Sequence, residues 1–162
     1  MEVIDILGRS ELFGSFEKKY LEKIVPLCRS QHYSMGETIF NEESESKDFY
    51  ILTDGNLALE KKVKQAFENR TLVTRLEEIG KGEAFGWSGL IEPHTFSASV
   101  RCLTDCEVLC INCESLRELM DSDPNLGYEL VQRLARLISS RMTYARDNLT
   151  RSLSQVHLAQ EI

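Results

Sequence analysis

The sequence predicts a mainly β fold, an antiparallel sandwich or barrel flanked by helices. Between residues 31 and 111, short apolar runs alternate with turn residues about every ten positions, as antiparallel strands do. Met35-Gly36, Asp54-Gly55-Asn56 and Gly80-Lys81-Gly82 supply residues that tolerate the positive φ of tight turns. On both sides of this region, apolar residues recur at helical spacing instead.

The expected helices divide the chain into three parts. Residues 1–30 form an N-terminal helical element, in which Ser15 is the expected N-cap. Residues 31–112 form the β domain. Residues 113–162 form a short helix and then a long one, which starts at Asp123-Pro124 with Asp as the N-cap and Pro at the first helical position.

The apolar stripe of the long helix continues to Val156, for about eight turns, which is more than a small domain covers. Two interpretations are open: the second half frays, or it pairs with the same helix of a second subunit. We favour a homodimer because the stripe persists so far. The residues expected at the dimer helix are Leu134, Leu137, Ile138, Met142, Ala145 and Leu149.

The composition is that of a folded, acidic protein of 162 residues, with a net charge of −7 and a pI near 5.1. This charge disfavours direct nucleic-acid binding by the chain. No apolar run reaches the roughly 18 residues of a membrane span, and the N-terminus does not resemble a signal peptide. We therefore expect a cytoplasmic protein without membrane contact, whose five cysteines are thiols.

Several segments, in order, resemble the cyclic nucleotide-binding domain family, which includes the Crp/Fnr-type regulators. They are LFGSFEKKYLEKIV, SMGETIFNEESESKDFYILTDGNLAL, GKGEAFGWSGL and SASVRCLTDCEVLCINCESLREL, and together they cover roughly residues 12–141. The resemblance implies an antiparallel, jelly-roll-like β-roll that holds a cyclic phosphate against a short helix. It also implies a C-terminal helix that caps the pocket and transmits the signal.

The family's phosphate-binding cassette corresponds to residues 82–100. Its pattern is F-G-E, a turn with small residues and Leu, and then R-x-A-T/S-V. The matching residues are Phe85, Gly86, Leu90, Ala98, Ser99 and Val100. Backbone amides of the short helix and the hydroxyls of the serines are potential donors to a ligand. The expected ligand-binding residues are Phe85, Gly86, Trp87, Ser88, Gly89, Leu90, Thr95, Phe96, Ser97, Ala98 and Ser99.

Two cassette positions depart from the family. Trp87 stands where the family has the Glu that accepts the ribose hydroxyl, and indole is only a donor. Phe96 stands where the family has the phosphate-binding Arg, and a shift of one residue would place Thr95 there. Neither nearby candidate restores the charge: His94 is expected in a loop, and Arg101 lies an odd number of residues along the strand and should point away.

The two aromatic residues leave two interpretations open. Trp87 and Phe96 form a pocket for a flat, less charged ligand, or they fill the space that a nucleotide would use. No side chain of the cassette is expected to neutralise a phosphate.

Catalysis and metal binding are not indicated. A zinc site usually has two C-x2-C pairs, and only Cys110 and Cys113 have that spacing. We therefore interpret Cys102, Cys106, Cys110 and Cys113 as buried hydrophobic residues. The three His residues are scattered, and no nucleotide-binding or nucleophile motif occurs.

We therefore predict a non-catalytic regulatory or sensor module, without cofactor or metal, that binds cyclic AMP and cyclic GMP weakly or not at all. One alternative is a genuine cyclic-nucleotide sensor that uses backbone amides, Ser88 and Ser99. The other is the sensor half of a Crp/Fnr-type transcription regulator. A winged helix-turn-helix follows the long helix in those regulators, and this sequence is expected to stand alone without it.

Overall fold

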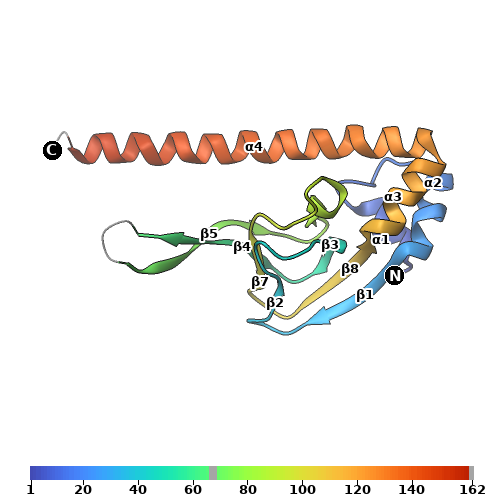
Figure 1. Cartoon of the computed structure of the whole chain (residues 1–162), viewed down its shortest axis with the longest axis horizontal. Helices are drawn as coiled ribbons and strands as arrows, with labels where there is room; N and C mark the ends of the chain where they lie inside the picture. Colours follow the sequence, from blue (N-terminus) through green and yellow to red (C-terminus); the bar gives the residue numbers. More distant parts are fainter. Residues whose placement is uncertain (66–68, 161–162) are drawn as a thin grey trace.

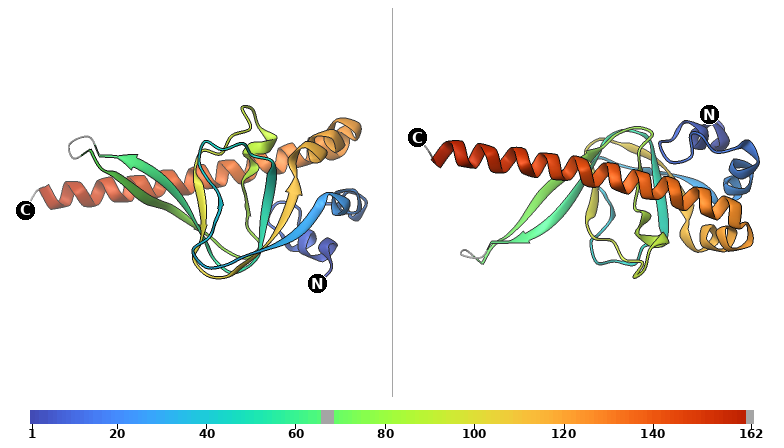
Figure 2. Two further views of the ribbon diagram at one scale, coloured as in Figure 1. Left: turned by 60° about the horizontal axis from the view of Figure 1, so that its bottom comes forward. Right: turned by 90° about the horizontal axis from the view of Figure 1, so that it is seen from above.

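Two four-stranded antiparallel sheets close into a roll, with helices at one end and along one side (Figures 1 and 2). The computed structural model describes residues 1–65 and 69–160. The strand orders are β1-β8-β3-β6 and β2-β7-β4-β5, so the predicted antiparallel β-roll is confirmed. The strands are β1 (Cys28–Tyr33), β2 (Thr38–Phe40), β3 (Asp48–Asp54), β4 (Leu57–Lys64), β5 (Thr71–Ile79), β6 (Ala84–Phe85), β7 (Ser99–Cys102) and β8 (Cys106–Asn112).

The N-terminal element differs from the prediction. It contains a helix that the sequence analysis did not anticipate, α1 (Val3–Arg9), and then α2 (Lys18–Ile24) and a 3₁₀ turn (Val25–Leu27). The expected N-cap at Ser15 is wrong, because Glu17 occupies that position. The Ser15 hydroxyl instead accepts a hydrogen bond from Arg133, which lies far along the chain.

Gly55 forms the turn that joins β3 to β4. Its φ is 94°, and a Cβ there would lie 2.4 Å from the carbonyl oxygen of Asp105. Only glycine fits without strain in a left-handed conformation with so close a neighbour. The predicted turn at Asp54-Gly55-Asn56 is thus explained by backbone geometry.

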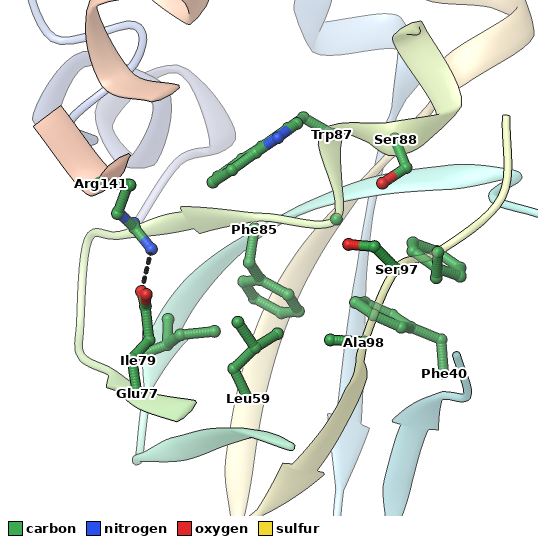
Figure 3. A pocket seen from close by; sticks show the side chains of 12 residues that line it. Phe40, Leu59, Glu77, Ile79, Phe85, Trp87, Ser88, Ser97, Ala98 and Arg141 are labelled. Atoms are coloured by element: carbon green, nitrogen blue, oxygen red, sulfur yellow. Dashed lines mark hydrogen bonds and ion pairs between the residues drawn. The ribbon is translucent and has the colours of Figure 1, made fainter. Parts of the chain in front are cut away.

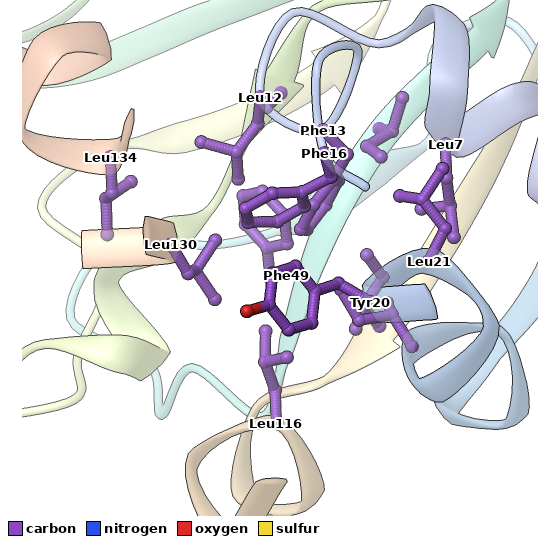
Figure 4. Close-up of a cluster of buried hydrophobic side chains, with 14 of the residues drawn as sticks. Leu7, Leu12, Phe13, Phe16, Tyr20, Leu21, Phe49, Leu116, Leu130 and Leu134 are labelled. Carbon is purple, nitrogen blue, oxygen red and sulfur yellow. The ribbon is translucent and has the colours of Figure 1, made fainter. Parts of the chain in front are cut away.

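Buried side chains form two clusters. The first joins the helices to one sheet and includes Phe13, Phe49, Leu116 and Leu130 (Figure 4). The second lies inside the roll and draws side chains from both sheets, among them Val100 and the aromatic residues of the candidate site. The roll therefore has its own hydrophobic core, and a second hydrophobic cluster attaches the helices to the roll.

Two helices follow the strands, α3 (Cys113–Ser122) and α4 (Pro124–Gln160). The predicted N-cap of the long helix is confirmed, because the Asp123 carboxylate accepts a hydrogen bond of 3.2 Å from the amide of Leu126. The Lys23 amine lies 2.6 Å from the same carboxylate and links α2 to this point.

The first third of α4 packs on the helical core through Leu126, Leu130 and Leu134. Its C-terminal half extends beyond the roll, and the β4–β5 hairpin projects from the same end of the molecule (Figures 1 and 2). Within residues 1–65 and 69–160, no helix combines the length and the apolar character needed to cross a bilayer.

Candidate functional site

The cassette begins with a sharp reversal of the chain at Gly86. β6 ends at Phe85, and a 3₁₀ helix (Trp87–Leu90) follows immediately. Gly86 has a φ of 74°, and a Cβ there would lie 2.8 Å from Cδ2 of the Tyr50 ring. The absence of a side chain therefore allows the backbone to turn against that ring and places Trp87 beside the roll.

A cavity of about 120 Å³ lies between this turn and the inner face of the roll (Figure 3). Ligand pockets more commonly measure about 300–1,000 Å³, so this one is small. Its walls are mostly apolar, with two serines and an ion pair at the edge. The lining residues are Phe40, Leu59, Glu77, Ile79, Phe85, Gly86, Trp87, Ser88, Phe96, Ser97, Ala98 and Arg141.

Phe96, which the sequence analysis aligns with a phosphate-binding Arg, is packed into the interior of the roll. Its ring is stacked on Phe40 with centroids 3.6 Å apart and an interplanar angle of 7°. Phe85 extends the aromatic group, 6.1 Å from Phe40 and 5.1 Å from Tyr50. The Phe96 side chain is 5% exposed, so it occupies space inside the fold.

Arg141 of α4 is the cation in this pocket, and the sequence analysis did not find it. Its Nη1 donates a hydrogen bond of 2.6 Å to Glu77, and its Nη2 donates bonds of 2.7 Å to Glu11 and 3.1 Å to the carbonyl oxygen of Ala84. The guanidinium carbon lies 5.5 Å from the centroid of the Trp87 ring. Arg141 thus connects the long helix to the N-terminal element, β5, β6 and the cassette.

The charge around Arg141 is negative overall. Glu83 is also near, with its carboxylate 3.8 Å from Nη2, so three carboxylates surround one guanidinium, a net formal charge of −2. We call Glu11, Glu77 and Glu83, with Arg141 among them, the acidic pole. Burial alone would lower the pKa of Arg141, but the carboxylates of Glu11 and Glu77 outweigh it and raise that pKa.

A helical pattern could have indicated Arg141. It lies seven residues after Leu134 and four after Leu137, on the face of α4 that packs against the rest of the chain. A single Arg that continues a buried apolar face requires carboxylate partners. The identity of those partners depends on contacts between residues far apart in the sequence.

The cassette residues chosen from the sequence divide into two groups. Phe85, Gly86, Trp87, Ser88, Phe96, Ser97 and Ala98 line the cavity. Gly89, Leu90, Thr95 and Ser99 do not, and the Ser99 hydroxyl accepts a hydrogen bond of 2.9 Å from the amide of Glu42. The sequence analysis also missed Phe40, Leu59, Glu77 and Ile79, which come from strands outside the cassette.

The other cations near the cassette lie outside the lining. Arg101 points away from the cavity, as expected, and bonds Glu60 with a shortest N–O distance of 2.6 Å. Lys61 donates a hydrogen bond of 2.8 Å to the carbonyl oxygen of Ser97. His94 is in a loop, as expected, and lines a separate hollow together with Arg117.

The cysteines behave as buried hydrophobic residues. Cys102, Cys106, Cys110 and Cys113 are buried and unpaired. Burial raises the pKa of Cys110 to about 11 and that of Cys113 to about 12, so both thiols stay protonated at neutral pH. Among the residues that the structure describes, no three His, Cys, Asp or Glu side chains are grouped as metal ligands.

A family model for the cyclic nucleotide-binding domain matches residues 30–123, more than half of the chain. Among curated proteins, a CRP-like cAMP-activated global transcriptional regulator of Mycobacterium tuberculosis is 20% identical over 132 residues. That match covers 82% of this chain and 57% of the regulator, so the chain spans just over half of that relative's length. The cyclic nucleotide-gated channel alpha-4 of Mus musculus is 26% identical over 127 residues, 75% of this chain and 21% of the channel.

Solved structures agree on the fold. A cyclic nucleotide-binding domain from Methylobacillus flagellatus superposes with a TM-score of 0.77 at 17% identity and covers 93% of this chain and 82% of that one. The Catabolite Activator Protein of Thermus thermophilus gives a TM-score of 0.69 at 23% identity, over 87% of this chain and 62% of that one. The regulatory domain of Toxoplasma gondii PKA, solved with cAMP, gives a TM-score of 0.61 at 20% identity and covers 72% of this chain and 42% of that one.

Proposed function

This chain belongs to the cyclic nucleotide-binding domain family, and we propose that it is a non-catalytic regulatory module of that family with little or no affinity for cyclic AMP or cyclic GMP. The observation that carries this proposal is the position of Phe96. A buried ring stacked on Phe40 stands where the family places the Arg that neutralises the cyclic phosphate.

The two replaced side chains remove the contacts that a cyclic nucleotide needs. A charge-assisted hydrogen bond contributes about 1.5–3 kcal/mol, and its loss weakens binding by roughly ten- to a hundredfold or more. Trp87 cannot accept the hydrogen bond of a ribose hydroxyl, because its indole N–H is only a donor. The two losses involve different groups of the ligand, the ribose hydroxyl and the cyclic phosphate, so each weakens binding.

The electrostatics of the pocket oppose a phosphate further. Arg141 is the only cation among the lining residues, and its guanidinium already bonds Glu11 and Glu77. The acidic pole carries a net formal charge of −2, so an incoming phosphate would be repelled. The cavity of about 120 Å³ is also small for a nucleotide.

The outer face of α4 supports a homodimer. Val131, Ala135, Ile138, Met142, Ala145 and Leu149 follow one another in steps of four and three, the spacing of a coiled-coil seam. Met142 is 55% exposed and Leu149 is 61% exposed. By contrast, Leu134 is buried in the chain's own core, and Leu137 and Ile138 pack partly against that core. Leu134 and Leu137 therefore lie beside the seam, and Ile138 lies at its edge.

Calorimetric titration of the chain with cyclic AMP and with cyclic GMP tests this function. We expect no heat of binding at micromolar concentrations of either nucleotide. Micromolar affinity for one of them would contradict the proposal and favour a second candidate, a genuine cyclic-nucleotide sensor. That candidate draws support from Ser88 and Ser97, whose side chains line the cavity and could donate to a phosphate.

A further inference from the structure

The cavity matches a single ring in size and surface. An apolar cavity of about 150 Å³ is known to bind benzene, and the present volume of about 120 Å³ is similar. Leu59 and Ile79 line one side, and Phe85 and Trp87 provide aromatic surface (Figure 3). One flat ring with one polar substituent would fill this space, whereas a ligand with a second ring system would be too large to fit.

The polar edge of the cavity selects the sign of that substituent. Glu77 and Arg141 both line the cavity, while Glu11 and Glu83 approach the same guanidinium from outside the lining. An anion would meet a net charge of −2 and a guanidinium whose donors are engaged. A cation would meet carboxylate oxygens that exceed the available positive charge, beside an indole whose ring already has the Arg141 guanidinium 5.5 Å from its centroid.

From these observations we infer that the pocket takes a single-ring organic cation, a flat apolar ring bearing one amine or amidine group, and rejects anions of the same shape. The positive group meets Glu77, and the ring lies between Phe85 and Trp87. An amidine suits this position because its planar pair of N–H donors matches the two oxygens of a carboxylate. This inference rests on the proposed function and names the ligand class for the same site.

Three probes of nearly identical shape but different charge test this inference: benzamidine, a cation; benzamide, which is neutral; and benzoate, an anion. The chain contains one tryptophan, Trp87, so its fluorescence reports directly on the pocket. We expect benzamidine to bind at least tenfold more tightly than benzoate, with benzamide between them. Benzoate binding as tight as benzamidine binding, or no response of Trp87 to any probe, would overturn the inference.

A matched pair of variants tests the role of the carboxylate. Glu77→Gln removes the charge that lines the cavity and should weaken benzamidine binding at least tenfold. Glu78→Gln is the control, because Glu78 is the exposed neighbour that bonds Arg75 and does not line the cavity. Equal affinity in both variants would count against the inference. If Glu77→Gln does not fold, the three probes on the unaltered chain still decide.

The outcomes separate this inference from the proposed function. A failure of benzamidine to bind removes the ligand class but leaves the lack of cyclic-nucleotide binding untouched. Micromolar affinity for cyclic AMP overturns the proposed function, whatever the probes show.

Discussion

The guanidinium of Arg141 donates a hydrogen bond of 2.6 Å to the carboxylate of Glu77, and this contact ties the middle of α4 to β5 at the edge of the pocket. The Arg141 side chain is 15% exposed, so water screens the pair only partly. The helix that carries the proposed dimer seam and the strand that lines the cavity are thus joined through one residue.

Replacing Arg141 with Ala should destabilise the fold by about 1–3 kcal/mol. The substitution leaves Glu11, Glu77 and Glu83 close together without their cation. Chemical denaturation measures the loss. Arg136→Ala, at an exposed position of the same helix, is the control and should cost less than about 0.5 kcal/mol. An equal loss in both variants would mean that the acidic pole does not anchor α4.

The double substitution Trp87→Glu with Phe96→Arg should create or strengthen binding of cyclic nucleotides. It restores the acceptor for the ribose hydroxyl and the cation for the phosphate, and it removes the ring that is stacked on Phe40. Titration with cyclic AMP should show at least a tenfold gain over the unaltered chain. Trp87→Glu alone is the control and should gain less. A folded double variant without any gain would indicate that the cassette backbone itself has diverged.

Leu149→Glu should convert the proposed dimer to a monomer, because it places a charge in the apolar seam. Leu149 is 61% exposed in the single chain, so the substitution should leave the fold of the monomer unchanged. Light scattering gives the mass of each species. The control, Ser154→Glu, lies on the opposite side of α4 and should remain dimeric. A dimer that survives Leu149→Glu would place the interface elsewhere.

The ion pair of Glu60 and Arg101 should contribute to stability at neutral pH and lose that contribution in acid. The hydrogen bond from Arg101 lowers the pKa of Glu60 below its ordinary value of 4.5. As the pH falls below 4.5, the unfolded chain binds the proton first, so stability declines until the pH passes the lowered pKa of the folded state. The free energy of unfolding, measured between pH 7 and pH 3, should fall less steeply in Glu60→Gln. Glu118→Gln, an exposed position, should keep the original slope.

The parts of the fold that were predicted correctly depend on short-range patterns. Gly55 allows a left-handed turn with the Asp105 carbonyl close by, and Asp123 caps α4 through the amide of Leu126, three residues along the chain. The N-terminal element was predicted less well. Ser15 had a suitable side chain for a cap, but its hydroxyl is bonded by Arg133 of α4, which no local pattern reveals.

The candidate site was predicted in the same uneven way. Residues from Phe85 to Ser88 and from Phe96 to Ala98 line the cavity because one continuous segment turns around it. Phe40, Glu77 and Arg141 come from three other elements, and their arrival at the same place depends on how the sheets and α4 pack. Whether the aromatic residues form a pocket or fill the space that a nucleotide would use also depends on packing. Phe96 fills space inside the roll, while Trp87 stays at the rim of a small cavity.

The sequence by itself determined the β-roll, its flanking helices and the presence of the uncharged Trp87 and Phe96 in the expected cassette, because strand periodicity, turn chemistry and residue identity are local properties. The tertiary structure alone decided which charge stands at the pocket. Arg141 reaches the cavity from a helix that begins after the last strand, and Glu11, Glu77 and Glu83 approach its guanidinium from three other segments. Electrostatic energy depends on distance in space and not on separation along the chain. Only the folded chain therefore reveals that three carboxylates surround the single guanidinium of Arg141.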